Sequence, residues 1–315
     1  MSETKGASAL AAIHEGGKAA LARALGRIES HGHAAETAAL LDAALSAGRA
    51  HVIGLTGPPG VGKSTLTDAL IRAFRARGET VGVVAVDPTS ARSGGALLGD
   101  RTRLRRDAED DGVFVRSMAA RESLGGLAAL VLPAVVLMAA VRDVVIVETV
   151  GVGQSETAIA GIADTVVFCV QPGSGDALQF MKAGVMEIPD IAVVTKADMG
   201  DVARRAVSDL RGALSLGGAG EGVPVMSCSA SAGEGVDDLV AALGDRARAT
   251  GSADARRAQA AEWLTAELGE EFGRTGLRRL APGLDLARSE TPFARAAGVR
   301  DEICAILSRI APERG

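Results

Sequence analysis

The feature that most constrains this chain is the nine-residue stretch GPPGVGKST at positions 57–65. Two glycines with four residues between them, followed by lysine and serine, are typical of a phosphate-binding loop. The glycines let successive backbone N–H groups turn toward one point, where phosphate oxygens bind. Lys63 is expected to reach the outer phosphates, and the Ser64 hydroxyl to bind Mg²⁺. The residues predicted to contact a nucleotide here are Gly57, Pro58, Pro59, Gly60, Val61, Gly62, Lys63, Ser64 and Thr65.

The residues on both sides of this loop support the same interpretation. An apolar run at 52–55 precedes the loop and predicts a buried strand. A helix is expected from Ser64 to about Arg77, where Gly78 ends it. Strand, loop and helix in this order are the context that the motif requires, because the positive end of the helix then faces the bound anion.

Apolar runs alternate with helical segments between residues 51 and 247, and most of them show no polar alternation. Continuous apolar strands are typical of a parallel sheet covered on both faces. The fold class is therefore α/β, a doubly wound, mostly parallel sheet with helical extensions at both ends. The predicted strands are residues 52–55, 81–86, 113–115, 144–147, 166–170, 191–194 and 223–226.

We predict three parts: a helical extension over 1–48, a nucleotide-binding domain over 49–248 and a second helical extension over 249–315. In the last part, Thr291 is a candidate N-cap with Pro292 at the first helical position. The helix that follows has an apolar side, which must be buried on the core domain or on a second subunit.

Composition excludes several classes of function. A net charge of −5 argues against a nucleic-acid partner. The N-terminus has no secretion-signal pattern, and the three cysteines are expected to be reduced core residues, so we expect a cytoplasmic protein. Residues 124–141 carry no charge, but Pro133 interrupts them midway. We interpret this run as a buried core helix rather than a membrane span.

A base-recognition motif follows the strand predicted at 191–194. Thr195, Lys196 and Asp198 match the pattern by which GTP-binding proteins recognise guanine. The carboxylate of Asp198 can accept two hydrogen bonds from guanine, from N1–H and the exocyclic amine, whereas N1 of adenine has no hydrogen to donate. Ser229 and Ala230, after the next strand, resemble the short element whose backbone contacts the guanine carbonyl. The order of these motifs predicts GTP and GDP as ligands.

Acidic residues at strand ends are candidates for Mg²⁺ binding and hydrolysis. Glu148 ends one strand and Gly151 follows, where G proteins place an Mg²⁺-shell carboxylate and a γ-phosphate sensor. Asp87 and Asp100 are further candidates, although Asp100 could instead cap a helix, and either could position the attacking water. Ras-like proteins place glutamine directly after the glycine, whereas here the first glutamine is Gln154. Intrinsic hydrolysis is therefore expected to be slow.

Longer stretches within about residues 50–240 resemble the MeaB/ArgK family; they are the phosphate loop, 87–90, 99–103, 115–119, 124–126, 147–156 and 172–184. The resemblance implies a homodimeric GTPase that binds an adenosylcobalamin-dependent acyl-CoA mutase, such as methylmalonyl-CoA mutase, and gates its cofactor loading. It also implies Mg²⁺ and hydrolysis roles for Lys63, Asp87, Asp100 and Glu148, with Lys182 signalling to the mutase. The residues in its switch segments would be Arg103, Gly151, Gln154, Asp176 and Lys182.

Two features depart from that family, and two other functions stay open. The family usually has asparagine where this chain has Thr195, but signal-recognition GTPases also use threonine there, so guanine preference is expected to persist. Residues 127–141 are more apolar than the family pattern leads us to expect. A kinase or ATPase linked to amino-acid transport could use the same phosphate loop, but it would have no use for the guanine motif. A nickel-insertion GTPase would need cysteine or histidine ligands near the loop, and the sequence shows none there.

Overall fold

A computed structural model describes residues 2–32, 34–88, 110–120, 128–149, 158–173, 188–216, 222–249, 253–280 and 291–310. Its centre is a seven-stranded sheet in which every neighbouring pair is parallel. The strands, in their order across the sheet, are β3 (Val113–Ala120), β2 (Val81–Pro88), β4 (Val144–Thr149), β1 (His51–Thr56), β5 (Thr165–Val170), β6 (Ile191–Val194) and β7 (Val225–Ser227). The predicted parallel α/β sheet is confirmed.

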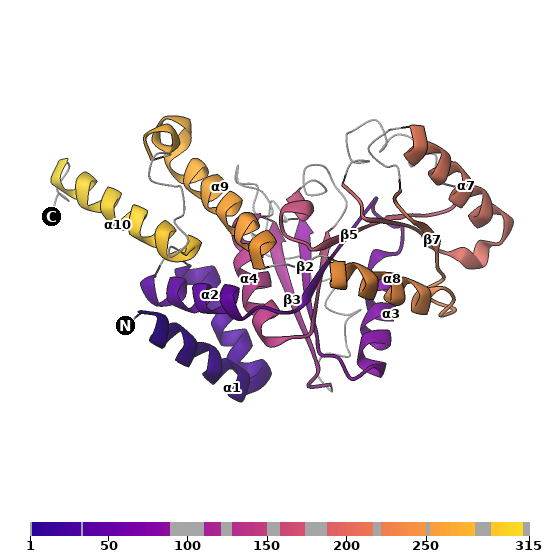
Figure 1. The fold of residues 1–315 in the computed structure, drawn as a ribbon, viewed down its shortest axis with the longest axis horizontal. Helices are drawn as coiled ribbons and strands as arrows, with labels where there is room; N and C mark the ends of the chain where they lie inside the picture. The colour runs from indigo at the N-terminus through magenta and orange to yellow at the C-terminus, as the bar shows by residue number, and fades with distance from the viewer. Residues whose placement is uncertain are drawn as a thin grey trace.

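Helices cover both faces of this sheet, which makes it doubly wound (Figure 1). One face holds α3 (Lys63–Ala76) and α8 (Val236–Ala249), and the other holds α4 (Ala128–Val141) and α7 (Asp201–Leu216). Strand β5 shows why its apolar run is continuous. Phe168 and Val170 pack on the α7 side, while Val167 and Cys169 pack on the α3 and α8 side. Both faces of the strand are thus buried, as expected for a parallel sheet.

Helix α3 ends where the sequence predicts. Gly78 has φ +81°, and its N–H donates to the carbonyl of Arg75 at 2.9 Å. The N–H of Glu79 donates to the carbonyl of Phe74 at 3.1 Å. These two bonds form a Schellman motif, which needs a residue with positive φ and therefore favours glycine.

The helical segments at the two ends of the chain lie on the same side of the sheet (Figure 1). They are α1 (Ser2–His31, interrupted at Gly17), α2 (Ala35–Ala47), α9 (Ala253–Leu280, interrupted at Gly273) and α10 (Pro292–Ile310). Helix α4 packs on the sheet and also contacts α1, α2 and α9. Residues 131–139 of α4 are accordingly buried all round, which explains why this helix is so apolar.

Asp42 of α2 joins the first and last parts of the chain. Its carboxylate accepts hydrogen bonds from the Thr291 hydroxyl at 2.6 Å and from the N–H groups of Phe293 and Ala294 at 3.2 and 2.9 Å. Burial raises the pKa of Asp42, and these three bonds oppose that shift. Helix α10 does begin at Pro292, but the side chain that caps it comes from α2 rather than from Thr291.

The cysteines follow the prediction only in part. Cys169 and Cys228 are buried free thiols, and burial raises their pKa values to about 12 and about 11. Cys304 is exposed on α10, so its assignment to the core is wrong. This helix buries its first turns, whereas Ile306, farther along its apolar side, is exposed like Cys304. None of the described helices combines the length and the hydropathy needed to cross a bilayer.

Candidate nucleotide site

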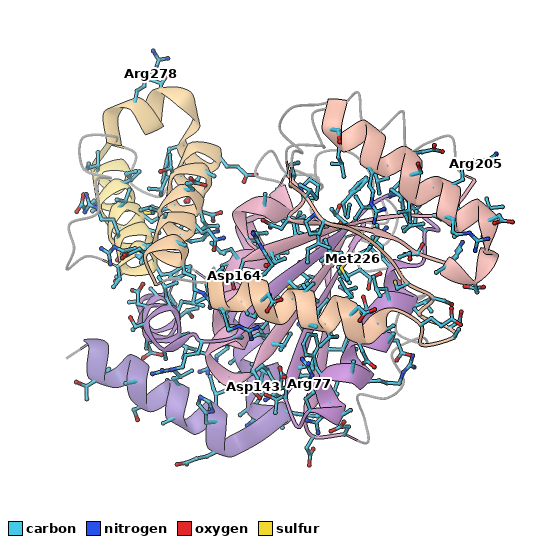
Figure 2. The ribbon with its side chains drawn as sticks, turned by 45° about the vertical axis from the view of Figure 1, so that its right-hand side comes forward. Arg77, Asp143, Asp164, Arg205, Met226 and Arg278 are labelled. Carbon is cyan, nitrogen blue, oxygen red and sulfur yellow. The ribbon has the colours of Figure 1, made fainter. Side chains whose placement is uncertain are left out.

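The phosphate-loop residues connect β1 to α3 at the carboxyl edge of the sheet. Figure 2 marks the opposite edge, where Arg77 ends α3 and Asp143 precedes β4. Gly57, Gly60 and Gly62 all have positive φ, at +136°, +78° and +97°. A Cβ on Gly57 would also lie only 2.1 Å from the carbonyl oxygen of Cys169. Glycine is therefore required at position 57 both for its backbone conformation and for its close contact with β5.

The two polar residues that begin α3 lie in different surroundings. Lys63 is buried, and its ammonium group donates to the carbonyls of Gly57 and Pro58 at 2.7 and 2.9 Å. The Ser64 hydroxyl donates to Oε1 of Glu148 at 2.6 Å. Glu148 is opposite Leu55 in the β1–β4 register, one strand away from the loop. The strand pairing therefore brings the serine and the carboxylate together across 84 residues of sequence.

Thr195 joins the predicted base-recognition motif to the phosphate loop. Its buried hydroxyl lies 2.6 Å from the carbonyl oxygen of Val61 and 3.0 Å from that of Val170, and it donates its one hydrogen to this pair. Asparagine, which the family usually has here, would also place a donor on its side chain. The threonine therefore keeps a donor at this position, and it connects the end of β6 to the loop.

Lys196 and Asp198 continue from Thr195 into the short helix η5 (Ala197–Met199). Lys196 has φ +55°, and no other non-glycine residue in the described ranges has a positive φ. In this strained conformation, the Lys196 ammonium group donates to the Gly60 carbonyl at 3.3 Å. The same ammonium group also donates to the side-chain oxygen of Gln171. The exposed Asp198 accepts a hydrogen bond from the buried Ser229 hydroxyl at 2.6 Å. Ser229 thus orients the carboxylate.

Other predicted residues are described only in part or not at all. Asp87 lies at the carboxyl end of β2, opposite Ala119 of β3, and Ala230 directly follows Ser229. Asp100, Arg103, Gly151, Gln154, Asp176 and Lys182 lie outside the described residues. Sequence reasoning missed Thr67, whose hydroxyl donates to Oε2 of Glu148 at 2.8 Å. Its position three residues after Ser64 places it on the same helix face, which is the signal that could have revealed it.

Comparison with known proteins identifies the family. The family model described as methylmalonyl Co-A mutase-associated GTPase MeaB matches residues 21–274. This chain belongs to the MeaB family of GTPases. The match extends beyond the predicted nucleotide-binding domain on both sides, into α1 and through most of α9.

Individual relatives agree with the MeaB assignment. A protein of Pyrococcus horikoshii is 59% identical over 152 residues, which cover 48% of each chain. The match therefore spans about half the length of that relative. GTPase ArgK of Escherichia coli is 36% identical over 279 residues, covering 84% of each chain. A crystal structure of a LAO/AO transport system kinase matches with a TM-score of 0.62 and 28% identity, over 90% of this chain and 98% of that one.

The donor set of this MeaB-family chain fits a hard divalent cation. Ser64 and Glu148 offer a hydroxyl and a carboxylate at the start of α3, and oxygen ligands of this kind suit Mg²⁺. Because Ser64 donates its hydrogen to Glu148, the lone pairs of its oxygen stay free to bind a cation. No group of three histidine, cysteine, aspartate or glutamate side chains that could hold a metal occurs within the described part of the chain. An Mg²⁺ ion here would take its other ligands from nucleotide phosphates and water.

Proposed function

We propose that the chain binds GTP and GDP with Mg²⁺ at the carboxyl edge of the sheet and hydrolyses GTP slowly. The observation that supports this most strongly is the joining of the two motifs. Thr195 lies 2.6 Å from the phosphate-loop carbonyl of Val61, and Asp198 three residues later has its carboxylate oriented by Ser229. The residues proposed to bind the phosphates and those proposed to bind the base are therefore placed to contact the same nucleotide.

Each residue has a defined task in this proposal. The N–H groups of the loop and the ammonium of Lys63 hold the β- and γ-phosphates, while Ser64 and Glu148 hold the Mg²⁺ shell. When bound, Mg²⁺ neutralises the charge that develops on the phosphate oxygens. Asp198 accepts two hydrogen bonds from guanine. Asp87 and Asp100 are the proposed groups for orienting the attacking water.

Asp198→Asn tests guanine recognition. Each hydrogen bond to a charged group contributes about 1.5–3 kcal/mol, so losing both should weaken GDP binding by about 10²–10⁴-fold. Xanthosine diphosphate should bind more tightly to the variant than to the wild type, because the asparagine amide can donate to the xanthine carbonyl. Competition against a fluorescent GDP analogue measures both affinities. The matched control is Asp201→Asn, an exposed aspartate three residues later, which should leave both unchanged.

The same titration separates this proposal from the kinase or ATPase alternative. The wild-type chain should prefer GDP to ADP by at least about 100-fold, since adenine repels the Asp198 carboxylate. Equal affinity for the two nucleotides, or a preference for ADP, would overturn the guanine assignment.

We further propose that the nucleotide state gates an adenosylcobalamin-dependent acyl-CoA mutase, with the chain acting as a homodimer. Support for the mutase comes from the name of the matching family. Support for the dimer comes from Ile306, which is 54% exposed on the apolar side of α10. A second copy could cover this surface.

Lys182→Ala tests the link to the mutase. We expect this variant to keep the GDP affinity of the wild type but to lose the stimulation of GTP hydrolysis by methylmalonyl-CoA mutase. Phosphate release with and without the mutase measures the stimulation of GTP hydrolysis. Elution from a calibrated sizing column, in GDP or a slowly hydrolysed GTP analogue, shows whether the chain is a dimer and whether it forms a complex with the mutase. Full mutase-stimulated hydrolysis by Lys182→Ala would refute the role of Lys182, and a monomeric elution volume would refute the dimer.

A further inference from the structure

Thr67 has a hydroxyl group that the nucleotide motifs do not account for. The residue is fully buried on α3, one turn after Ser64, where a threonine lowers helix propensity. Its hydroxyl does not bond back to its own helix, as buried threonines often do, but donates to Oε2 of Glu148 at 2.8 Å. Ser64 donates to the other oxygen of the same carboxylate at 2.6 Å. Two successive turns of α3 therefore hold both oxygens of Glu148.

This double contact fixes the plane of the carboxylate. A glutamate has one more rotatable bond than the aspartate usually found at this place, so a single hydrogen bond would leave its second oxygen free to turn. The bond from Thr67 removes this freedom. It also leaves Oε1 directed at Ser64, whose oxygen keeps its lone pairs for a cation. The longer side chain of Glu148 and the hydroxyl of Thr67 thus act as a matched pair.

We propose that Thr67 is a positioning residue, which holds Glu148 in the orientation that completes the Mg²⁺ shell at Ser64. This inference rests on the proposed nucleotide site and extends it by one residue. Thr67 touches neither nucleotide nor metal in this proposal. Its effect is therefore expected in the Mg²⁺ dependence of nucleotide binding and not in the intrinsic affinity for GDP.

Thr67→Val removes the hydroxyl at nearly constant volume, and Thr67→Ser restores it. GDP affinity is measured by fluorescence in EDTA and then across an Mg²⁺ titration. In EDTA, both variants should bind GDP as the wild type does. The Mg²⁺ midpoint is the Mg²⁺ concentration at which half of the Mg²⁺-dependent change in GDP affinity has occurred. It should rise about tenfold in Thr67→Val, as expected for one lost hydrogen bond to a charged group. In Thr67→Ser it should lie within about threefold of the wild-type value.

A second pair of variants guards against an effect of packing alone. In a Glu148→Asp background the shorter carboxylate cannot span both hydroxyls, so adding Thr67→Val should change the Mg²⁺ midpoint by less than about twofold. If Thr67→Val does not fold, Thr67→Ala carries the same expectation. A wild-type Mg²⁺ midpoint in the valine variant, or an equal loss in the serine variant, would overturn the inference. Failure of wild-type protein to bind GDP at saturating Mg²⁺ would instead overturn the proposed function.

Discussion

A Lys63→Ala variant is expected to bind GDP and GTP with an affinity at least about 100-fold lower than that of the wild type. The Lys63 side chain is buried, and its ammonium group lies 2.7 Å from the carbonyl oxygen of Gly57 in the loop. Charge-assisted bonds to phosphate contribute about 1.5–3 kcal/mol each, and two of them correspond to about 10²–10⁴ in affinity. The variant also removes the ammonium group that bonds to the carbonyls of Gly57 and Pro58 and so holds the loop in its observed conformation. Calorimetric titration with GDP and Mg²⁺ measures the loss.

The control for Lys63→Ala is Lys5→Ala, which removes an exposed ammonium from α1 without touching the loop. Its GDP affinity should equal that of the wild type. Thermal unfolding without nucleotide shows that each variant is folded before its binding is interpreted. A folded Lys63→Ala protein with wild-type GDP affinity would exclude the loop as the phosphate site.

Arg256→Met is expected to lower the free energy of unfolding by about 3–5 kcal/mol, because it leaves a buried carboxylate without its cation. Arg256 donates to Asp164 at 2.8 Å and to the carbonyl of Ala50, and the two charged side chains are only 11% and 3% exposed. Figure 2 labels Asp164, which directly precedes β5. Guanidinium unfolding compared with the wild type measures the loss.

Arg204→Met is the matched control for Arg256→Met. Arg204 also pairs with an aspartate, Asp201, but their side chains are 74% and 90% exposed. Solvent screens such a pair, so its loss should change the free energy of unfolding by less than about 0.5 kcal/mol. Equal effects of the two substitutions would show that Asp164 is not held in place by Arg256.

Local patterns predicted the sheet well because each strand is apolar over most of its length. All seven predicted strands occur, with their ends displaced by a few residues. Strand β3 continues to Ala120 instead of ending at 115, since it pairs with β2 along eight residues despite its polar content. As an edge strand it can carry the polar Arg116 and Ser117, which a search for apolar runs excludes.

Long-range contacts were not predictable in this way. The pairing of Arg256 with Asp164 spans 92 residues, and the hydrogen bond between Thr67 and Glu148 spans 81. No period or motif in the sequence connects such residues. The motifs did assign Ser64 and Glu148 to the same predicted Mg²⁺ site, and the two side chains are hydrogen-bonded in the structure. The spacing of Thr67 from Ser64 places both on one helix face, but only the folded structure shows that Thr67 also contacts Glu148.

The capping of α10 by Asp42 has a consequence for how the chain matures on the ribosome. Thr291 follows its partner Asp42 by 249 residues, so at 5–20 residues per second it is synthesised roughly 12–50 s later. During this interval the Asp42 carboxylate lacks its partners at the start of α10, and the surface of α2 that contacts α10 stays uncovered by it. The nascent protein can therefore complete the packing of α2 only when α10 has left the exit tunnel.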